Sequence, residues 1–450
     1  MHLANITFVI LLLLTKCYAK SYRDYSLIHG IPKSDHELEF FKALDTFYNV
    51  TFWRKPSLVD KPVEFSLSRL NLAELIRDTR DMDIEFVTLI RDLQSAFDNQ
   101  TIKPYIRRRM ESFDWQNYYS VEDIYNWLRD LSDAHPREVR IQSIGQSVQN
   151  RHILAVNIDL GASDQTSRSV VMVEGGCHAR EWISPAFVTF MINTIVSSKN
   201  STNQELKQIA NSYKWIFIPL LNPDGYSYSQ TDDRLWRKNY RGKYGVDLNR
   251  NFGVAFGKFG AAKENKQDEE YCGKVPFSEP ETSALAAFIS DHSDLLEYYI
   301  SFHAYGQYII IPYAFEKEHM DNYDTVKQYA DQMAKQSLQK YNIYYHVGTA
   351  YDTVGYLASG TSSDWVKKTK NVSYTLTIEL PDQGYYGFTL PKEKILPTCE
   401  ATMDALIPFL DPKIDTKLRI RLFNGAKRHK SFKTVFFIAH NCIILIGLRI

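Results

Sequence analysis

The sequence has little cysteine, no excess of charge of either sign, and no apolar run long enough to cross a membrane. Five cysteines in 450 residues are too few for a disulfide-rich scaffold. Lysine plus arginine and aspartate plus glutamate both number 53, so the chain lacks the basic excess with which proteins bind nucleic acid. The two longest apolar runs, Ile6–Leu14 and Thr434–Leu448, fall short of the roughly 20 residues of a transmembrane helix.

The composition of the chain is that of a globular protein. Hydrophobic residues make up 44% and charged residues 24% of the sequence, which excludes global disorder. At about 100–200 residues per domain, the length predicts two to four domains.

Both ends of the chain have features of targeting segments. Ile6–Leu14 has the length of a signal-peptide core, and Cys17-Tyr18-Ala19 offers a cleavage site. We therefore expect a signal peptide at 1–19 and a secreted, extracellular protein; a buried N-terminal segment is the alternative. Within 412–450, the small residues Asn424-Gly425-Ala426 precede a polar spacer and an apolar tail, which is the order of a GPI-anchor signal. A disordered tail or a gene-model artefact are the alternatives, and membrane association is expected only if the tail is an anchor signal.

Residues 20–109 form a first block of mixed strands and helices. Strands are predicted at 50–54, 63–67 and 84–90, and helices at 70–79 and 91–97, which indicates a small α+β domain. The block ends in Arg107-Arg108-Arg109. In a secreted protein, a tribasic run at a domain boundary indicates cleavage by a trypsin-like or furin-like protease, and a solvated surface cluster is the alternative.

Residues 110–411 form a second block in which apolar runs alternate with helical periodicity. This alternation predicts a mostly parallel sheet covered on both faces. Ser184 is expected to cap the second helix, with Pro185 in its first turn. The predicted strands are 152–159, 168–174, 214–221, 296–302, 308–312 and 373–380, and the predicted helices are 121–133, 185–198, 279–291, 323–341 and 396–410.

A histidine and a glutamate three residues apart, His178 and Glu181, follow the predicted strand 168–174. Zinc accepts imidazole nitrogen and carboxylate oxygen, so one ion can bind both. Pairs with the same spacing begin at His36 and His135, so the spacing alone is a weak signal. Only His178 follows an apolar strand and a Gly-Gly turn, and ligand sites in α/β sheets lie beyond the carboxyl ends of strands.

Two further residues are candidates for the same site. His303 follows the predicted strand 296–302 and can reach the same edge as a third ligand, which catalytic zinc requires; a buried core histidine is the alternative. Glu379 lies within the apolar strand 373–380, where a carboxylate is costly to bury unless it is paired. This placement makes Glu379 a candidate functional carboxylate.

Seven short motifs resemble those of the secreted metallocarboxypeptidases of the pancreatic carboxypeptidase A/B family. Their order and rough spacing match over about 290 residues, and 20–109 resembles the activation segment of the family through Phe52-Trp53-Arg54 and Ile84–Gln94. The motifs lie at Gly176–Ser184, Leu221–Tyr226, Arg234–Asn239, Val246–Asn251, Ser301–Tyr305, Gly360–Trp365 and Thr377–Leu380.

The resemblance implies the fold and the cofactor. The expected fold is an α/β eight-stranded mixed sheet with helices on both faces, preceded by a small antiparallel pro-domain. One zinc ion would be held by His178, Glu181 and His303, and Glu379 would be the base that activates the attacking water. The implied activity is a zymogen that hydrolyses the C-terminal peptide bond of peptides and proteins.

The resemblance also implies the residues that bind the substrate. Arg237 matches the residue that stabilises the oxyanion, and Tyr356 matches the tyrosine that covers the bound C-terminal residue. Asn249 and Arg250, with Arg180 nearby, match the clamp for the terminal carboxylate. Such a clamp suits an exopeptidase, because a guanidinium recognises a carboxylate in a planar, two-point geometry.

Two positions depart from the pattern of the family. Lys243 stands where a cysteine commonly pairs with a later one, matched here by Cys272, so this disulfide is expected to be absent. Ser363 stands at the base of the specificity pocket, where an aspartate goes with basic and an aliphatic residue with apolar substrates. A neutral serine predicts a preference for apolar or aromatic C-terminal residues.

Two other functions compete with this interpretation. A catalytically inactive peptide-binding module would be signalled by loss of Glu379 or Arg237, and both are present. A zinc amidase or deacylase would share the His-x-x-Glu pair but would not need Asn249, Arg250 and Tyr356 together.

Overall fold

The computed structural model describes residues 19–100, 102–161 and 168–410. The predicted signal peptide, apart from Ala19, and the predicted tail at 412–450 lie outside these residues. Among the residues described, no helix combines the length and the apolar character needed to cross a membrane.

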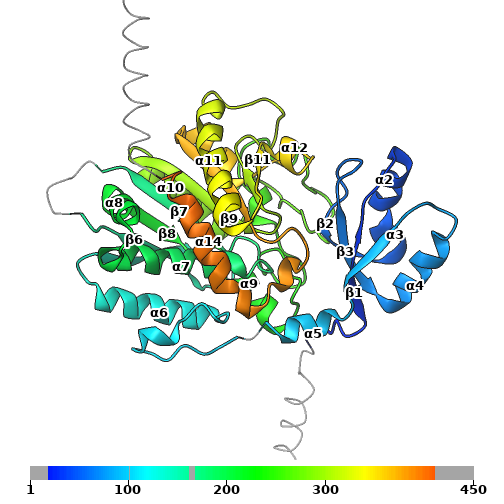
Figure 1. The fold of residues 1–450 in the computed structure, drawn as a ribbon, viewed down its shortest axis with the longest axis horizontal. Helices are drawn as coiled ribbons and strands as arrows, with labels where there is room; N and C mark the ends of the chain where they lie inside the picture. Colours follow the sequence, from blue (N-terminus) through cyan, green and yellow to red (C-terminus); the bar gives the residue numbers. More distant parts are fainter. Residues whose placement is uncertain (1–18, 101, 162–167, 411–450) are drawn as a thin grey trace, which may run out of the picture.

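The N-terminal part is a four-stranded antiparallel sheet in the order β2-β3-β1-β4 with helices packed on it (Figure 1). Its apolar core includes Ile28, Phe41, Phe65 and Leu75. The small α+β fold predicted for this block is therefore confirmed. The strands are β1 (Tyr25–Gly30), β2 (Thr51–Arg54), β3 (Val63–Ser68) and β4 (Phe86–Ile90), and the helices are α2 (Asp35–Lys42), α3 (Leu44–Tyr48), α4 (Arg69–Asp78) and α5 (Leu93–Asp98).

The second part is built on an eight-stranded sheet in the order β11-β10-β12-β9-β7-β8-β6-β5. The central strands β12, β9, β7 and β8 are parallel to one another, whereas β6 runs antiparallel to both β5 and β8. The sheet is thus mixed, as the resemblance implied. Its strands are β5 (Val139–Gln146), β6 (His152–Ile158), β7 (Val170–Glu174), β8 (Lys214–Ile218), β9 (Leu296–Ala304), β10 (Tyr308–Ile310), β11 (His346–Gly348) and β12 (Tyr374–Leu380).

Helices cover both faces of this sheet because successive strand side chains point to opposite sides. In β7, Val171 and Val173 pack into one apolar cluster with α6, α7, α8, α11 and α14, and Val170 and Met172 pack into a second cluster with α10. The helices are α6 (Val121–Ala134), α7 (Ile183–Ser197), α8 (Gln204–Ser212), α9 (Pro223–Thr231), α10 (Pro280–His292), α11 (Tyr323–Tyr341), α12 (Ala350–Thr353), α13 (Ser362–Trp365) and α14 (Ile395–Leu406).

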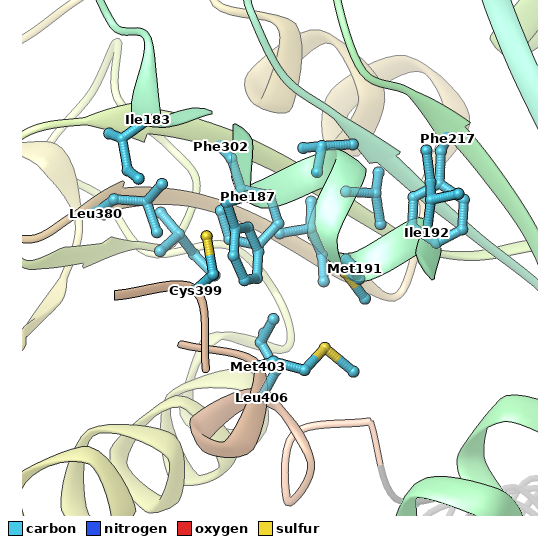
Figure 2. Packing of buried hydrophobic residues seen from close by; sticks show 14 of the residues in the cluster. Ile183, Phe187, Met191, Ile192, Phe217, Phe302, Leu380, Cys399, Met403 and Leu406 are labelled. Carbon is cyan, nitrogen blue, oxygen red and sulfur yellow. The ribbon is translucent and has the colours of Figure 1, made fainter. Parts of the chain in front are cut away.

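Helix α7 is apolar on nearly all sides because it lies between the sheet and α14. Figure 2 shows Phe187 and Met191 of α7 between Phe302 of the sheet and Met403 of α14. All four side chains are buried. This packing fixes the start of α7, and therefore the short segment that connects it to β7.

The cap predicted for α7 is wrong. Trp182, not Ser184, is the N-cap residue, and its side chain makes no capping hydrogen bond. The Ser184 hydroxyl instead donates to the carbonyl of Phe302 at 2.6 Å and accepts from the Gly176 N–H at 2.9 Å. Ser184 therefore ties the segment after β7 to the end of β9.

Candidate metal centre and active site

The carboxyl ends of three parallel strands bring the predicted site residues to one edge of the sheet. His178 and Glu181 lie in the segment between β7 and α7, and His303 is the penultimate residue of β9, which pairs with β7. Glu379 lies near the end of β12, opposite His303 in the register of β12 and β9. The chain turns sharply after β7 at Gly176, whose φ of +64° is a conformation that favours glycine.

The three predicted ligands converge and are buried. Nitrogen and oxygen atoms of His178, Glu181 and His303 lie within 4.8 Å of one another. The Nδ1 atoms of the two histidines are 3.0 Å apart, and each lies near one carboxylate oxygen of Glu181, at 2.7 Å from His178 and 3.1 Å from His303. Adjacent ligands of a tetrahedral zinc ion are about 3.3 Å apart, so this donor set fits such an ion.

The remaining ring nitrogens have partners that orient the two histidines. His178 Nε2 lies 3.1 Å from Oδ1 of Asp247, and His303 Nε2 lies 3.0 Å from the Ser301 hydroxyl. A proton on His178 Nε2 donates to the carboxylate and leaves the Nδ1 lone pair directed at the centre of the triad. Carboxylate partners of this kind fix the tautomer of metal-binding histidines.

Electrostatic interactions couple the ionisation of Glu181 to that of the two histidines. Burial raises the pKa of Glu181, but the neighbouring rings of His178 and His303 outweigh it and hold the pKa well below its usual range. Burial lowers the pKa of His303, whereas the charge of Glu181 and its hydrogen bond raise it, with a net value of about 9. Glu181 is therefore ionised, and without a metal its charge is balanced by a proton on His303, whose place a zinc ion would take.

Glu379 differs from Glu181 in both surroundings and protonation. Its side chain is only partly buried and lines the cavity next to the triad. Burial raises its pKa to about 7, and the charge of Glu181 acts in the same direction, while His303 opposes both. A carboxylate with a pKa near neutrality can accept and return a proton at physiological pH.

Arg237 points at the triad from the segment after α9. Its Nε and Nη2 donate to Oδ2 of Asp247 at 3.1 and 2.8 Å, and its Nη1 lies 3.8 Å from Oε1 of Glu181. Asp247 thus holds both Arg237 and His178. The guanidinium is therefore held in a fixed orientation beside the triad.

The predicted carboxylate clamp lies in the same cavity. Asn249 and Arg250 form the end of a short 3-10 helix, Leu248–Arg250, and Asn249 Nδ2 lies 3.5 Å from His303 Nε2. Arg250 Nη2 donates to Glu270 Oε1 at 3.3 Å, and Arg180 pairs with Glu269 at 3.0 Å. Each of the two arginines therefore already holds one carboxylate.

Tyr356 and Ser363 lie at different depths of the cavity. Tyr356 follows α12 and is 38% exposed, whereas Ser363 in α13 is 3% exposed. The Ser363 hydroxyl lies 2.7 Å from that of Thr377. Nine of the ten residues predicted for the site line the cavity, and the tenth, His303, lies against it in the triad; the nine are His178, Arg180, Glu181, Arg237, Asn249, Arg250, Tyr356, Ser363 and Glu379.

Comparison with known proteins decides the family. Residues 124–405 match the family described as zinc carboxypeptidase, and residues 30–100 match the carboxypeptidase activation peptide. The chain belongs to the zinc carboxypeptidase family. It is therefore a metallocarboxypeptidase that carries an activation peptide.

Several carboxypeptidases are similar to this zinc carboxypeptidase along most of its length. Zinc carboxypeptidase A 1 of Anopheles gambiae is 33% identical over 397 residues, which cover 87% of this chain and 90% of the relative. Carboxypeptidase A6 of Mus musculus is 33% identical over 402 residues, covering 86% and 90%. The crystal structure of thrombin activatable fibrinolysis inhibitor has a TM-score of 0.80 at 26% identity, covering 87% of this chain and 99% of that one.

The activation peptide forms part of the lining of the cavity. Trp53, Arg54 and Lys55 line it together with the site residues. The ring of Trp53 lies 5.1 Å from that of Phe388, and Lys55 Nζ donates to Glu270 Oε2 at 2.7 Å. A peptide substrate would meet these side chains before it reached the triad.

The structure adds two acidic residues that sequence reasoning did not assign. Asp247 is fully buried, and Glu270 joins the clamp to the activation peptide. A signal for Asp247 was available, because a carboxylate between the apolar residues Val246 and Leu248 requires a partner. Glu270 lies in the polar run Asp268-Glu269-Glu270, which is indistinguishable in sequence from a solvated loop.

None of the three cysteines in the described part of the chain belongs to the group of converging metal ligands. Cys177 is buried and, although adjacent to His178, is not among the converging ligands. Cys272 is a buried free thiol. Cys399 is also a free thiol, and Cys442 lies outside the described residues.

Proposed function

We propose that this chain is the secreted precursor of an enzyme that removes the C-terminal residue from peptides, with a preference for apolar and aromatic residues. The observation that carries the proposal is one cavity beside the triad of metal ligands, lined by a carboxylate with a pKa near neutrality and by three arginines of the catalytic part. The activation peptide closes this cavity until it is removed.

The proposed zinc ligands are His178, Glu181 and His303. Their convergence and the Asp247 partner of His178 support this assignment. When bound, zinc polarises the scissile carbonyl and makes a water molecule more acidic.

In the proposed reaction Glu379 takes a proton from the attacking water and returns it to the leaving amine. Its position opposite His303 in the sheet supports this role. Arg237 stabilises the oxyanion, and the ion pair with Asp247 keeps its guanidinium oriented before the substrate arrives. Preorganised donors of this kind contribute about 3–4 kcal/mol to the transition state.

The terminal carboxylate of the substrate would bind between Asn249 and Arg250, with Arg180 nearby. Arg250 and Arg180 already hold Glu270 and Glu269, which supports the idea that this wall of the cavity binds carboxylates. Tyr356, which is partly exposed on the loop after α12, would cover the bound residue.

Activation is proposed to occur at Arg107–Arg109, between an activation domain at 20–109 and a catalytic domain at 110–411. All three arginines are exposed, so a trypsin-like protease has access to them. The activating protease and peptide C-termini are the two proposed classes of partner, and entry into the secretory pathway rests on the signal peptide at 1–19.

Removal of the metal tests the proposed chemistry. We expect the trypsin-activated protein to lose activity in 1,10-phenanthroline and to regain it on addition of Zn²⁺, with mass spectrometry showing loss of one C-terminal residue. A peptide with an amidated C-terminus is the matched control and should be cleaved poorly, because the clamp needs a carboxylate. Equal cleavage of the amidated peptide would favour an amidase, and activity unaffected by chelation would contradict the metal site.

The chemistry of the pocket leads to a prediction of specificity. We expect kcat/KM for peptides ending in Phe or Leu to exceed that for Lys by about tenfold to a hundredfold. Ser363 and Thr377 are neutral, and the Asp364 carboxylate accepts backbone N–H groups of Ala314 and Phe315. A buried, unpaired ammonium costs several kcal/mol, whereas burying an apolar side chain contributes about 1.5–3 kcal/mol.

Ser363→Asp and Ser363→Ala form a matched pair for this prediction. The aspartate should shift preference towards Lys, and the alanine should keep the apolar preference. A wild-type kcat/KM for Lys higher than that for both Phe and Leu would refute the assignment of the pocket.

A further inference from the structure

A lysine of the activation peptide occupies an acidic position inside the active-site cavity. Lys55 directly follows β2, and its Nζ lies 2.7 Å from Oε2 of Glu270 and 3.8 Å from Oδ1 of Asp268. Glu270 and Asp268 belong to the catalytic part of the chain, 215 and 213 residues away. The contact therefore joins a segment that activation removes to a wall that stays with the enzyme.

Glu270 is also a neighbour of the clamp. Its other carboxylate oxygen, Oε1, accepts from Arg250 Nη2 at 3.3 Å. Burial raises the pKa of Glu270, but Lys55 and Arg250 together hold it below its usual range, so the side chain is a carboxylate. One carboxylate oxygen of Glu270 thus contacts Arg250 of the clamp, and the other contacts Lys55 of the activation peptide.

The depth of each residue indicates which part of a substrate meets Glu270. Ser363, at the base of the pocket for the C-terminal side chain, is 3% exposed, whereas the side chain of Glu270 is 16% exposed and that of Asp268 is 34% exposed. Lys55, whose side chain is 38% exposed, reaches Glu270 from the part of the cavity that the activation peptide lines. A peptide whose C-terminal residue fills the buried pocket at Ser363 must extend outward, towards these more exposed side chains.

Loss of the activation peptide leaves Glu270 Oε2 without its cation. Arg250 is engaged elsewhere, because its Nη2 donates to the other oxygen, Oε1, and its Nε and Nη1 donate to the carbonyls of Gly260 and Asn249. A half-buried carboxylate oxygen with a second carboxylate nearby binds an ammonium or guanidinium group well.

We propose that Glu270, assisted by Asp268, is a specificity-determining residue that binds a basic side chain on the N-terminal side of the scissile bond. Lys55 occupies in the precursor the place that a substrate lysine or arginine takes in the enzyme. The inference rests on the proposed carboxypeptidase function and adds a second determinant to it. Because the ion pair is partly exposed, we expect a basic side chain to raise kcat/KM by about three- to tenfold over a neutral one, and this gain should fall as the salt concentration rises.

Matched peptides test this inference. The activated enzyme is assayed on peptides that end in Phe and carry Lys, Arg, norleucine or Glu at the penultimate or preceding position. We expect kcat/KM for Lys to exceed that for norleucine by about three- to tenfold in the wild type and in Glu122→Gln, an exposed control on α6. The ratio of kcat/KM for Lys to that for norleucine should fall to about one in Glu270→Gln and should fall less far in Asp268→Asn. Asp268→Asn replaces Glu270→Gln as the test variant if Glu270→Gln does not fold.

Binding of the same peptides to the activated Glu379→Gln protein, measured by calorimetry, separates the two proposals. Absent hydrolysis of every peptide would overturn the proposed function, while a Lys preference in binding would still support the subsite. A ratio of one in the wild type, or an unchanged ratio in Glu270→Gln, would overturn the subsite. A gain confined to Lys at the C-terminal position would also overturn it, because Glu270 would then belong to the terminal pocket.

Discussion

Glu379→Gln should yield a folded protein that keeps its metal ligands but turns over substrate about 10²–10⁴-fold more slowly. Glutamine has the shape of glutamate but cannot take a proton from water. The substitution should leave the triad intact, because His178, Glu181 and His303 contact one another and make no hydrogen bond with the Glu379 side chain. The measurements are kcat on a peptide ending in Phe and the zinc content of the purified, activated protein.

Glu393→Gln is the matched control, since Glu393 lies in an exposed 3-10 helix, Lys392–Lys394, outside the cavity. It should retain wild-type kcat and zinc. If Glu379→Gln kept its zinc and a rate within about tenfold of wild type, the proton-transfer role would have to be abandoned.

Much of the fold could be predicted because long elements carry strong periodic signals. Helix α11 has the predicted bounds, 323–341, and the strands 296–302 and 373–380 correspond closely to β9 and β12. Strands β1, β5 and β11 were missed. β11 has only three residues, and β5 is an edge strand whose exposed face carries mostly polar side chains, so neither forms an apolar run.

Part of the site could likewise be predicted from short stretches of sequence, whereas the rest depends on contacts between residues far apart in the sequence. The triad and Glu379 follow from short motifs at the ends of strands that the sheet brings together. The cap of α7 was wrong because Ser184 is held by Phe302, which is 118 residues away. Likewise, nothing near Lys55 or Glu270 in sequence indicates their contact, because each lies in a polar segment and only the docking of two domains joins them.

This docking also explains why the precursor should be inactive. Lys55 pairs with Glu270, the Tyr305 hydroxyl donates to Glu64 of the activation peptide, and Trp53 packs on Phe388. A tethered domain has an effective concentration of the order of millimolar, and even a weak interface has a dissociation constant of about micromolar. The open form should then be populated at roughly one part in a thousand.

The full-length protein should therefore hydrolyse peptides about a thousandfold more slowly than the protein cut at Arg107–Arg109. The measurement is kcat/KM on a large peptide substrate before and after limited trypsin digestion, with gel electrophoresis to follow the release of the segment.

Replacing all three arginines by glutamine gives the matched control. These side chains lie on the surface, where Arg107 pairs with Asp130 and Arg109 with Glu111, so the fold should survive while trypsin loses its site. The control should stay inactive after trypsin treatment. If the wild-type precursor is fully active while its activation segment is still attached, the contacts with Glu270, Tyr305 and Phe388 do not block the cavity.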